Sequence, residues 1–320
     1  MRLFLAPMEG VVDAIMRDTI CRIGGIDACV TEFIRVTDHQ YPDKVFFRRC
    51  PELHNNSRTY GDIPVRVQLL GGKPEPIAAN AQRLAELGAA AIDLNFGCPA
   101  KTVNKNDGGA CLLQEPNRVH DIVYAVRQAV PQPTPVTAKI RLGFNDRSSY
   151  LDNAMAAANG GANELTVHAR SKADGYRPPA YWEYIANIRE QLSIPVIANG
   201  DIWTLDDFKR CQSITGCNDF MLGRGLLSQP GLAMQIKSHQ AGAQGKTLDW
   251  QQLSTILLTF FSATACQYPS QYMGNRLKQW LHYLTRHYDQ AKNLFEEIKR
   301  CREQQSITQA IIRSSNQWGL

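Results

Sequence analysis

The sequence of 320 residues has no CxxC pair, and its nine cysteines are an odd number scattered along the chain. This pattern excludes a disulfide framework and indicates reduced thiols, as in a cytoplasmic protein. The seven histidines show neither HxH nor HExxH spacing, so we expect no metal site. No stretch is long and apolar enough for a membrane span, and the apolar start, MRLFLAPMEG, is too short for a signal peptide. We therefore expect a cytoplasmic protein that binds no membrane.

The chain also lacks a strong overall charge, and the charge it has is concentrated near its end. The net charge is +5 at pH 7, and residues 251–320 hold eight basic side chains against four acidic ones. The first 250 residues are nearly neutral. A basic segment of this kind attracts polyanions, although a solvated helical face carries charge in the same way.

The order of elements along the first 240 residues predicts a barrel. Apolar strands alternate with amphipathic helices such as 76–87 and 117–129, with a period of roughly thirty residues. Since no GxGxxG follows the first strand, the pattern favours an α/β fold of the closed (β/α)8 TIM-barrel type over a doubly wound sheet. The expected strands are residues 3–8, 29–36, 65–70, 91–94, 136–142, 164–168, 196–199 and 219–223.

The pattern changes after the eighth unit. Residues 241–246, AGAQGK, are small and polar and predict a linker. Beyond them we expect only helices, at 250–267, 274–286 and 291–302, with a last turn from Ser306. Because one core rarely organises a chain of this length, we expect two domains, a barrel at 1–241 and a helical bundle at 242–320.

One cysteine stands where a barrel would carry a reacting group. The segment 91–113, AIDLNFGCPAKTVNKNDGGACLL, begins as a short apolar strand that Asn95, Gly97 and Pro99 interrupt. Cys98 is therefore expected on a stiff turn at the carboxyl end of a buried strand, where barrels place their active sites. A cysteine alone is more often a small buried side chain, so its surroundings decide its role.

Other expected strands also end in residues suited to a ligand. The strand 196–199 ends at Asn199 and runs into Gly200 and Asp201, and the strand 219–223 ends at Gly223 and runs into Arg224. Glycines and a cation at loops that open helices can hold a phosphate through backbone N–H groups and a fixed positive charge. Each loop taken alone is a common structural turn.

Lys139 lies in the middle of an expected strand, so its ammonium either reaches solvent or meets a partner inside the barrel. Inside, a lysine can form a Schiff base or donate to an electron-rich ring, and Gln68 could bind the same ring. His168 could reach a phosphate or a sugar chain, or it could be a buried core histidine. A planar ring at Gln68 and Lys139, with a phosphate tail in the two glycine loops, describes flavin mononucleotide (FMN).

Seven segments together resemble the tRNA-dihydrouridine synthases over the whole chain. They are LAPMEG, LNFGCPAKTV, GGACLL, VTAKIRLG, VHAR, VIANGDI and LGRG. The resemblance implies an FMN-binding catalytic barrel joined to a helical domain that binds tRNA. It also implies that the C5–C6 double bond of a uracil is reduced by hydride from the flavin, with NADPH as the electron donor.

The resemblance assigns individual residues as well. Cys98 would donate a proton to C5, and a thiol with an ordinary pKa of about 8.5 is protonated at neutral pH and can do so. The residues implied to hold FMN are Pro7, Met8, Glu9, Gln68, Lys139, His168, Asn199, Gly200, Asp201, Gly223 and Arg224.

Three further segments, TEFIRV, NRLKQWLHYL and LFEEIKR, are similar to a bacterial subfamily, subfamily C, which modifies position 16 of the D-loop. Lys299 stands where this subfamily tends to have arginine, Ala169 replaces a common glycine, and Asp201 replaces a glutamate seen in some members. Lysine cannot form a bidentate fork on phosphate, so the contact at Lys299 is expected to be weaker. Arg35 could instead belong to a structural ion pair. The tRNA contacts implied are Arg35, Asn95, Tyr176, Arg276, Lys278, Tyr283 and Lys299.

Two other functions share parts of this pattern. A flavin oxidoreductase acting on a free pyrimidine or another small molecule would use the barrel, FMN and the cysteine but not the basic helical segment. An RNA-binding protein without activity would need none of Cys98, Lys139 and Gln68. We expect a monomer, since a single tRNA site does not require a second copy.

Overall fold

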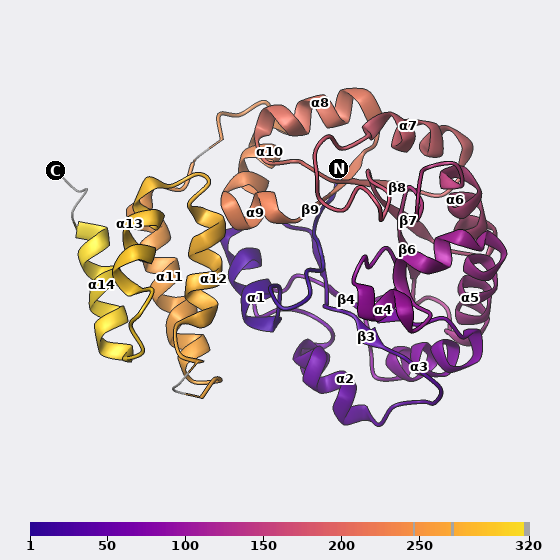
Figure 1. Cartoon of the computed structure of the whole chain (residues 1–320), viewed down its shortest axis with the longest axis horizontal. Coiled ribbons are helices and arrows are strands. Elements are labelled where there is room, and N and C mark those ends of the chain that lie inside the picture. The colour runs from indigo at the N-terminus through magenta and orange to yellow at the C-terminus, as the bar shows by residue number, and fades with distance from the viewer. Residues whose placement is uncertain (246, 270–271, 317–320) are drawn as a thin grey trace.

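The computed structural model describes residues 1–245, 247–269 and 272–316. A ring of strands enclosed by helices forms its larger part, and the helices of the C-terminal segment pack at one side of this ring (Figure 1). The strands are β1 (Leu3–Leu5), β2 (Ala28–Val30), β3 (Ile34–Arg35), β4 (Val65–Leu70), β5 (Ile92–Phe96), β6 (Val136–Arg141), β7 (Glu164–His168), β8 (Val196–Asn199) and β9 (Asp219–Leu222).

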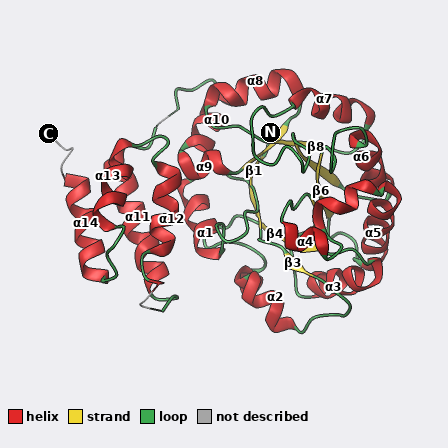
Figure 2. Ribbon diagram, in the orientation of Figure 1, coloured by secondary structure: helices red, strands yellow, loops and turns green. Residues whose placement is uncertain are grey.

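Eight of these strands close into a parallel barrel, which confirms the (β/α)8 fold expected from the sequence. The order is β2-β1-β9-β8-β7-β6-β5-β4, and β4 closes the ring by pairing with β2 through Cys29↔Val65. The short β3 continues along the same edge of β4 as β2, through Ile34↔Leu69 and Arg35↔Leu70. Parallel neighbours need crossover connections, and the helices that supply them cover the outside of the barrel (Figure 2).

Local sequence explains where several barrel helices begin. A proline opens both α3 and α5, where a backbone N–H is not needed, and Thr204 with Asp207 forms a capping box before α8. The helices up to residue 240 are α1 (Ala14–Ile23), α2 (Asp43–Arg49), α3 (Pro74–Glu86), α4 (Lys101–Lys105), α5 (Pro116–Ala129), α6 (Tyr150–Asn159), α7 (Trp182–Gln191), α8 (Leu205–Thr215), α9 (Arg224–Ser228) and α10 (Leu232–Gln240), with short 3-10 turns η1 (Pro51–Asn55) and η2 (Gly109–Gln114).

Successive side chains along each strand point alternately to the outside and the inside of the barrel. Residues such as Val67, Leu94 and Ala138 face outward and join the large core beneath the helices. A separate apolar cluster fills part of the interior, and its members are Phe4, Ala6, Ala28, Val30, Ile197 and Met221. Several interior positions of β4, β5 and β6 are polar instead, which leaves the barrel with hydrogen-bonding groups rather than a fully apolar centre.

The C-terminal helices are α11 (Trp250–Ala265), α12 (Asn275–Leu284), α13 (Asp289–Ile298) and α14 (Gln304–Asn316). They meet the barrel where α11 packs on α1 and α12 packs on α9 (Figure 1). Trp280 anchors this contact, because its buried indole Nε1 donates to the Leu227 carbonyl at 3.1 Å. The domain boundary expected at residue 241 stays a prediction, and Lys246 of the expected linker lies outside the described residues.

The expectation of only a last turn from Ser306 was wrong. α14 has 13 residues, and Ile307, Ala310 and Ile311 recur at helical spacing and are buried. Polar residues between them hide this periodicity in the sequence.

None of the described helices has the length and apolar character needed to cross a membrane.

Two expected strands differ clearly from the observed ones, and those expected at 91–94, 136–142 and 219–223 differ by one or two residues at an end. The strand expected at 29–36 is divided into β2 and β3, because the Thr31 hydroxyl accepts the Gln68 N–H at 3.0 Å and the regular strand pairing stops there. The strand expected at 3–8 ends at Leu5, and Pro7 close behind it has no N–H to pair.

Candidate active site

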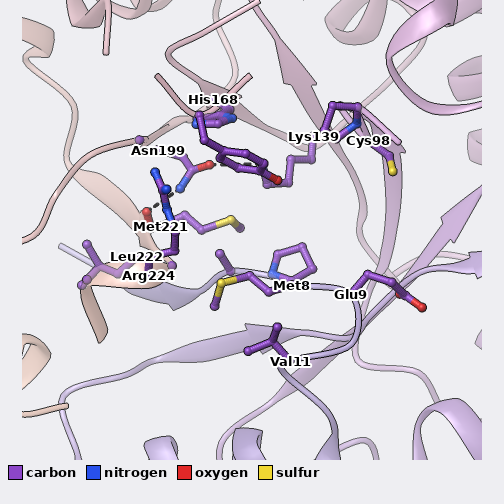
Figure 3. Close-up of a pocket in the computed structure, with 18 of the residues that line it drawn as sticks. Met8, Glu9, Val11, Cys98, Lys139, His168, Asn199, Met221, Leu222 and Arg224 are labelled. Carbon is purple, nitrogen blue, oxygen red and sulfur yellow. Dashed lines mark hydrogen bonds between the residues drawn. The ribbon is translucent and has the colours of Figure 1, made fainter. Parts of the chain in front are cut away.

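A cavity of about 650 Å³ opens at the carboxyl ends of the barrel strands, a volume typical of ligand and cofactor sites. Cys98 and Arg224 lie on opposite sides of it, with Lys139 and Met8 between them (Figure 3). Of the expected tRNA contacts, Asn95, Tyr176 and Tyr283 line this cavity. The structure also brings together here all residues expected at the flavin: Pro7, Met8, Glu9, Gln68, Lys139, His168, Asn199, Gly200, Asp201, Gly223 and Arg224.

The backbone of Cys98 is fixed from both sides. Its N–H and that of Gly97 donate to Asn95 Oδ1, each at 2.9 Å. Its carbonyl accepts from the Ala110 N–H at 3.0 Å. Gly109 has a φ of +69°, and a Cβ there would come within 2.8 Å of the Cys98 carbonyl oxygen. The loop therefore presents the thiol with little freedom to move.

A chain of hydrogen bonds extends from this loop into the barrel. Asn95 Nδ2 donates to Gln68 Oε1, and Gln68 Nε2 donates to Asp93 Oδ2, each at 2.7 Å. Thr137 Oγ1 completes the chain by donating to Asp93 Oδ1 at 2.6 Å. Burial raises the pKa of Asp93, while the bonds from Gln68 and Thr137 act against that rise. This series of hydrogen bonds couples the barrel interior to the turn that carries Cys98.

The Cys98 side chain is only partly exposed beside the cavity. Desolvation raises the pKa of its thiol above the usual value, and the Ala100 N–H and the charge of Arg141 act in the opposite direction. The thiol is therefore protonated at neutral pH. A protonated thiol beside a cavity can act as a general acid, whereas a nucleophilic cysteine needs a lowered pKa.

Two basic groups on the cavity wall have lowered pKa values. Lys139 Nζ donates to Asn199 Oδ1 at 3.1 Å, and burial, helped by the charge of Arg141, lowers the pKa of Lys139 to about 8. His168 is 8% exposed, and burial followed by the charges of Arg141 and Lys139 holds its pKa well below the usual range. An anion in the cavity would raise both pKa values by stabilising the charged forms.

Lys139 is expected to lower the stability of the cofactor-free protein. Its pKa is lower in the folded state than the ordinary 10.5, so the unfolded chain binds more protons between pH 8 and 10.5, and stability rises with pH there. Lys139→Met should therefore raise the free energy of unfolding at pH 7 by about 1–2 kcal/mol. The gain is smaller than the pKa shift alone implies, because water at the cavity mouth screens the charge of Lys139. Urea unfolding at pH 7 and pH 10.5 measures this gain, which should shrink at the higher pH. An equal gain at both values would contradict the assignment.

Asp201 organises the wall opposite Cys98. It forms an ion pair with the fully buried Arg170, and it accepts from Arg224 Nη2 at 3.3 Å and from Trp203 Nε1 at 3.2 Å. Gly200 beside it has a φ of +124°, and a Cβ there would come within 3.0 Å of the neighbouring imidazole ring. Because two guanidinium groups share one carboxylate, this wall keeps a net positive charge.

Four expected tRNA-binding cations lie outside the cavity. Arg35 stands on β3 and, within the described part of the chain, forms no ion pair, so its alternative role in a structural ion pair finds no support. Arg276 is bonded to the loop before α1, and Lys278 donates to a backbone carbonyl at 2.8 Å. Lys299, which follows the last residue of α13, is paired with Glu296 of that helix. Whether these four contact RNA stays a prediction.

Sequence reasoning missed other residues of the cavity. Glu32 lines it and is buried, and the signal was an acid inside the strand expected at 29–36. Trp203 lies two residues beyond Asp201 and had no signal except that spacing. Met221 is an apolar residue of a strand, and only the barrel geometry shows that it faces inward.

Among the described residues, no group of three His, Cys, Asp or Glu side chains is arranged to hold a metal ion.

Comparison with known proteins gives one consistent result. The model of the family described as dihydrouridine synthase matches residues 4–316. A tRNA-dihydrouridine(16) synthase of Aquipseudomonas alcaligenes is 51% identical over 98% of this chain and 100% of its own length. Proteins with the same name from Shewanella oneidensis and Haemophilus influenzae are 51% and 45% identical, over 97% and 96% of this chain and 97% and 98% of their own lengths. The chain is therefore an enzyme of the dihydrouridine synthase family, as its motifs predicted.

Proposed function

We propose that this enzyme reduces the C5–C6 double bond of a uridine in the D-loop of tRNA, at position 16, with FMN in the barrel cavity and NADPH as the electron donor. The observation that carries the proposal is the position of the Cys98 thiol, on the opposite side of the cavity from the cationic wall at Arg224 (Figure 3). Burial raises the pKa of this thiol, as a proton donor requires. The names of the relatives specify tRNA and position 16. The reaction belongs to the cytoplasm and needs one copy of the chain.

The residues present fit FMN. The cationic wall of Arg170 and Arg224 suits a phosphate, as does the space that Gly200 leaves for backbone approach. Lys139 and Gln68 would hold the ring, and His168 would lie near the phosphate end. Asn199, Asp201 and Gly223 complete the phosphate site, and Pro7, Met8 and Glu9 border the flavin. When bound and reduced, FMN supplies a hydride for C6 of the base.

Cys98 delivers the proton to C5. Its S–H bond breaks as the new C–H bond forms, and the thiolate left behind is stabilised by the nearby positive charge of Arg141. Arg141 Nε also donates to the Gly97 carbonyl at 2.8 Å, which holds the charge beside the turn. Solvent protons restore the thiol before the next turnover.

The substrate is a polymer, so the target uridine has to leave its stack and enter the cavity. Tyr176 is 56% exposed at the rim and offers an aromatic face to RNA, while Asn95 and Tyr283 line the cavity mouth. We assign catalysis to residues 1–241 and tRNA docking to residues 242–320. Lys278 and Lys299 are the docking cations of the second segment, and Arg35 adds one from the barrel. Arg276 would add positive charge there besides its contacts with residues 10–13.

The proposal is tested by mapping dihydrouridine at each D-loop position in total tRNA from cells with and without this gene. We expect loss confined to position 16, restored by the intact gene. Loss at another D-loop position would keep the reaction and overturn the assigned position. If tRNA is unchanged and the purified holoenzyme reduces free pyrimidines but not tRNA, the small-molecule alternative is correct.

A further inference from the structure

A second cavity, of about 580 Å³, lies beside the first. Four residues line both cavities: Tyr176, Asp201, Trp203 and Arg224. From this shared wall the second cavity extends to Arg286 and His287, which follow α12. It is therefore bounded by the barrel on one side and by the C-terminal helices on the other.

Trp203 holds two guanidinium groups in this cavity. Arg286 Cζ lies 3.9 Å and Arg224 Cζ 4.9 Å from the centre of its ring. The ring itself is fixed, because Nε1 donates to Asp201. A guanidinium that stacks on an aromatic ring still presents its N–H groups at its edge, in the fork geometry that matches phosphate oxygens.

The charge of Arg286 is not neutralised. Within the described residues, no carboxylate pairs with Arg286, which is exposed. The two acids of the second cavity already have partners, since Asp201 pairs with Arg224 and Asp207 pairs with Arg210. The second cavity is thus rich in cations, and it has one arginine fork without an acidic partner.

The wall that the two cavities share determines which phosphate can reach the guanidinium of Arg286. A base that enters the first cavity brings its neighbouring nucleotides across the rim, where Tyr176 is exposed and Arg224 Cζ lies 4.9 Å from the centre of the Tyr176 ring. A single strand follows such a surface by stacking on aromatic rings and by placing phosphates on cations. The next cation beyond Arg224 on the same tryptophan is Arg286.

We propose that the second cavity binds a backbone phosphate of the substrate RNA next to the reacting uridine, and that Arg286, stacked on Trp203, is the group that binds it. This inference rests on the proposed action on tRNA. It adds a contact between the docking helices and the strand that enters the active site. Arg286 then helps to place the target base as well as to attract the RNA.

The test measures binding of an unmodified tRNA transcript to the holoenzyme over a range of salt concentrations. Arg286→Gln keeps a planar group over Trp203 but removes the charge, and it should weaken binding about five- to tenfold and flatten the log Kd against log salt slope by about 0.7–0.9. Arg286→Lys keeps the charge, so it should restore the slope but not the full affinity. Arg189→Gln is the matched control, because it removes one positive charge at the C-terminal end of α7, near the amino ends of the strands.

The outcomes separate this inference from the proposed function. If the wild-type enzyme forms dihydrouridine in tRNA and Arg286→Gln binds the transcript with unchanged affinity and slope, the phosphate site is wrong and the function stands. If the same variant instead raises KM for NADPH alone, the second cavity serves the electron donor and the inference is overturned. A wild-type enzyme that neither binds nor reduces tRNA would remove the proposed function itself.

Discussion

Replacing Cys98 by alanine is expected to lower the rate of dihydrouridine formation at least about 100-fold, because general acid catalysis contributes a factor of about 10²–10⁴. Flavin should stay bound, since the phosphate wall and Lys139 are on other strands. Reduction of the flavin by NADPH should also continue, because it needs no proton at C5 of the base. The measurement is single-turnover reduction of a tRNA transcript by pre-reduced enzyme.

Cys111→Ala is the matched control. Cys111 is also partly exposed, burial raises the pKa of its thiol as it does for Cys98, and its Sγ lies 3.3 Å from the Gly108 carbonyl. It does not belong to the cavity wall described here. We expect its variant to react at the wild-type rate. Full activity of Cys98→Ala, or equal losses in both variants, would remove the assigned proton donor.

The sequence predicted the barrel because alternation of strands and helices is a local property. The strands at Val65–Leu70, Glu164–His168 and Val196–Asn199 match the expected bounds, since each is a short apolar run with clear turn signals around it. The interruption after Val30 depends on a side chain of one strand, Thr31, bonding the backbone of another. Such long-range pairing leaves no local pattern, so it could not be predicted.

The candidate site was predictable to a similar extent. Residues at strand ends meet in any such barrel, which is why Cys98, Lys139 and Asn199 could be grouped in advance. What the sequence does not contain is the partner of each side chain. Gln68 was expected to face a ring, and its amide is also bonded to Asp93 and Asn95. These contacts show that the side chain proposed to hold the ring also supports the turn that carries Cys98.

The partners of Arg276 were also not visible in the sequence, and they change the role expected for this residue. Its position in a basic helix suggested an RNA contact, but its side chain is only 12% exposed and reaches the loop between β1 and α1. Nη2 lies 2.8 Å from Asp13 Oδ2 and donates to the Val11 carbonyl at 2.6 Å, and Nη1 donates to the Gly10 carbonyl at 2.9 Å. This loop also carries Met8, which lines the cavity. Arg276 therefore joins the C-terminal helices to one wall of the active site.

Arg276→Ala is expected to lower the free energy of unfolding by about 2–3 kcal/mol, because it removes a partly buried ion pair and two charged hydrogen bonds. It should also speed the loss of flavin, since the loop with Met8 loses its support. Asp13→Asn is the informative companion, because asparagine keeps the cap of α1 that Asp13 provides to the Met16 N–H but removes the charge facing Arg276. It should act in the same direction with a smaller loss. A contact with RNA phosphate cannot explain such a loss, since Asp13 carries negative charge.

Lys299→Ala provides the contrast for both variants. Its ammonium, at the exposed end of α13, pairs with Glu296. Such a pair is worth a few tenths of a kcal/mol at most, so stability and flavin content should be unchanged. If Lys299 docks tRNA, its variant loses affinity for the transcript alone. Urea unfolding, flavin release and transcript binding, measured on all three variants, therefore separate support of the loop from contact with RNA. Unchanged unfolding and flavin release in Arg276→Ala and Asp13→Asn would show that the loop does not depend on the C-terminal helices.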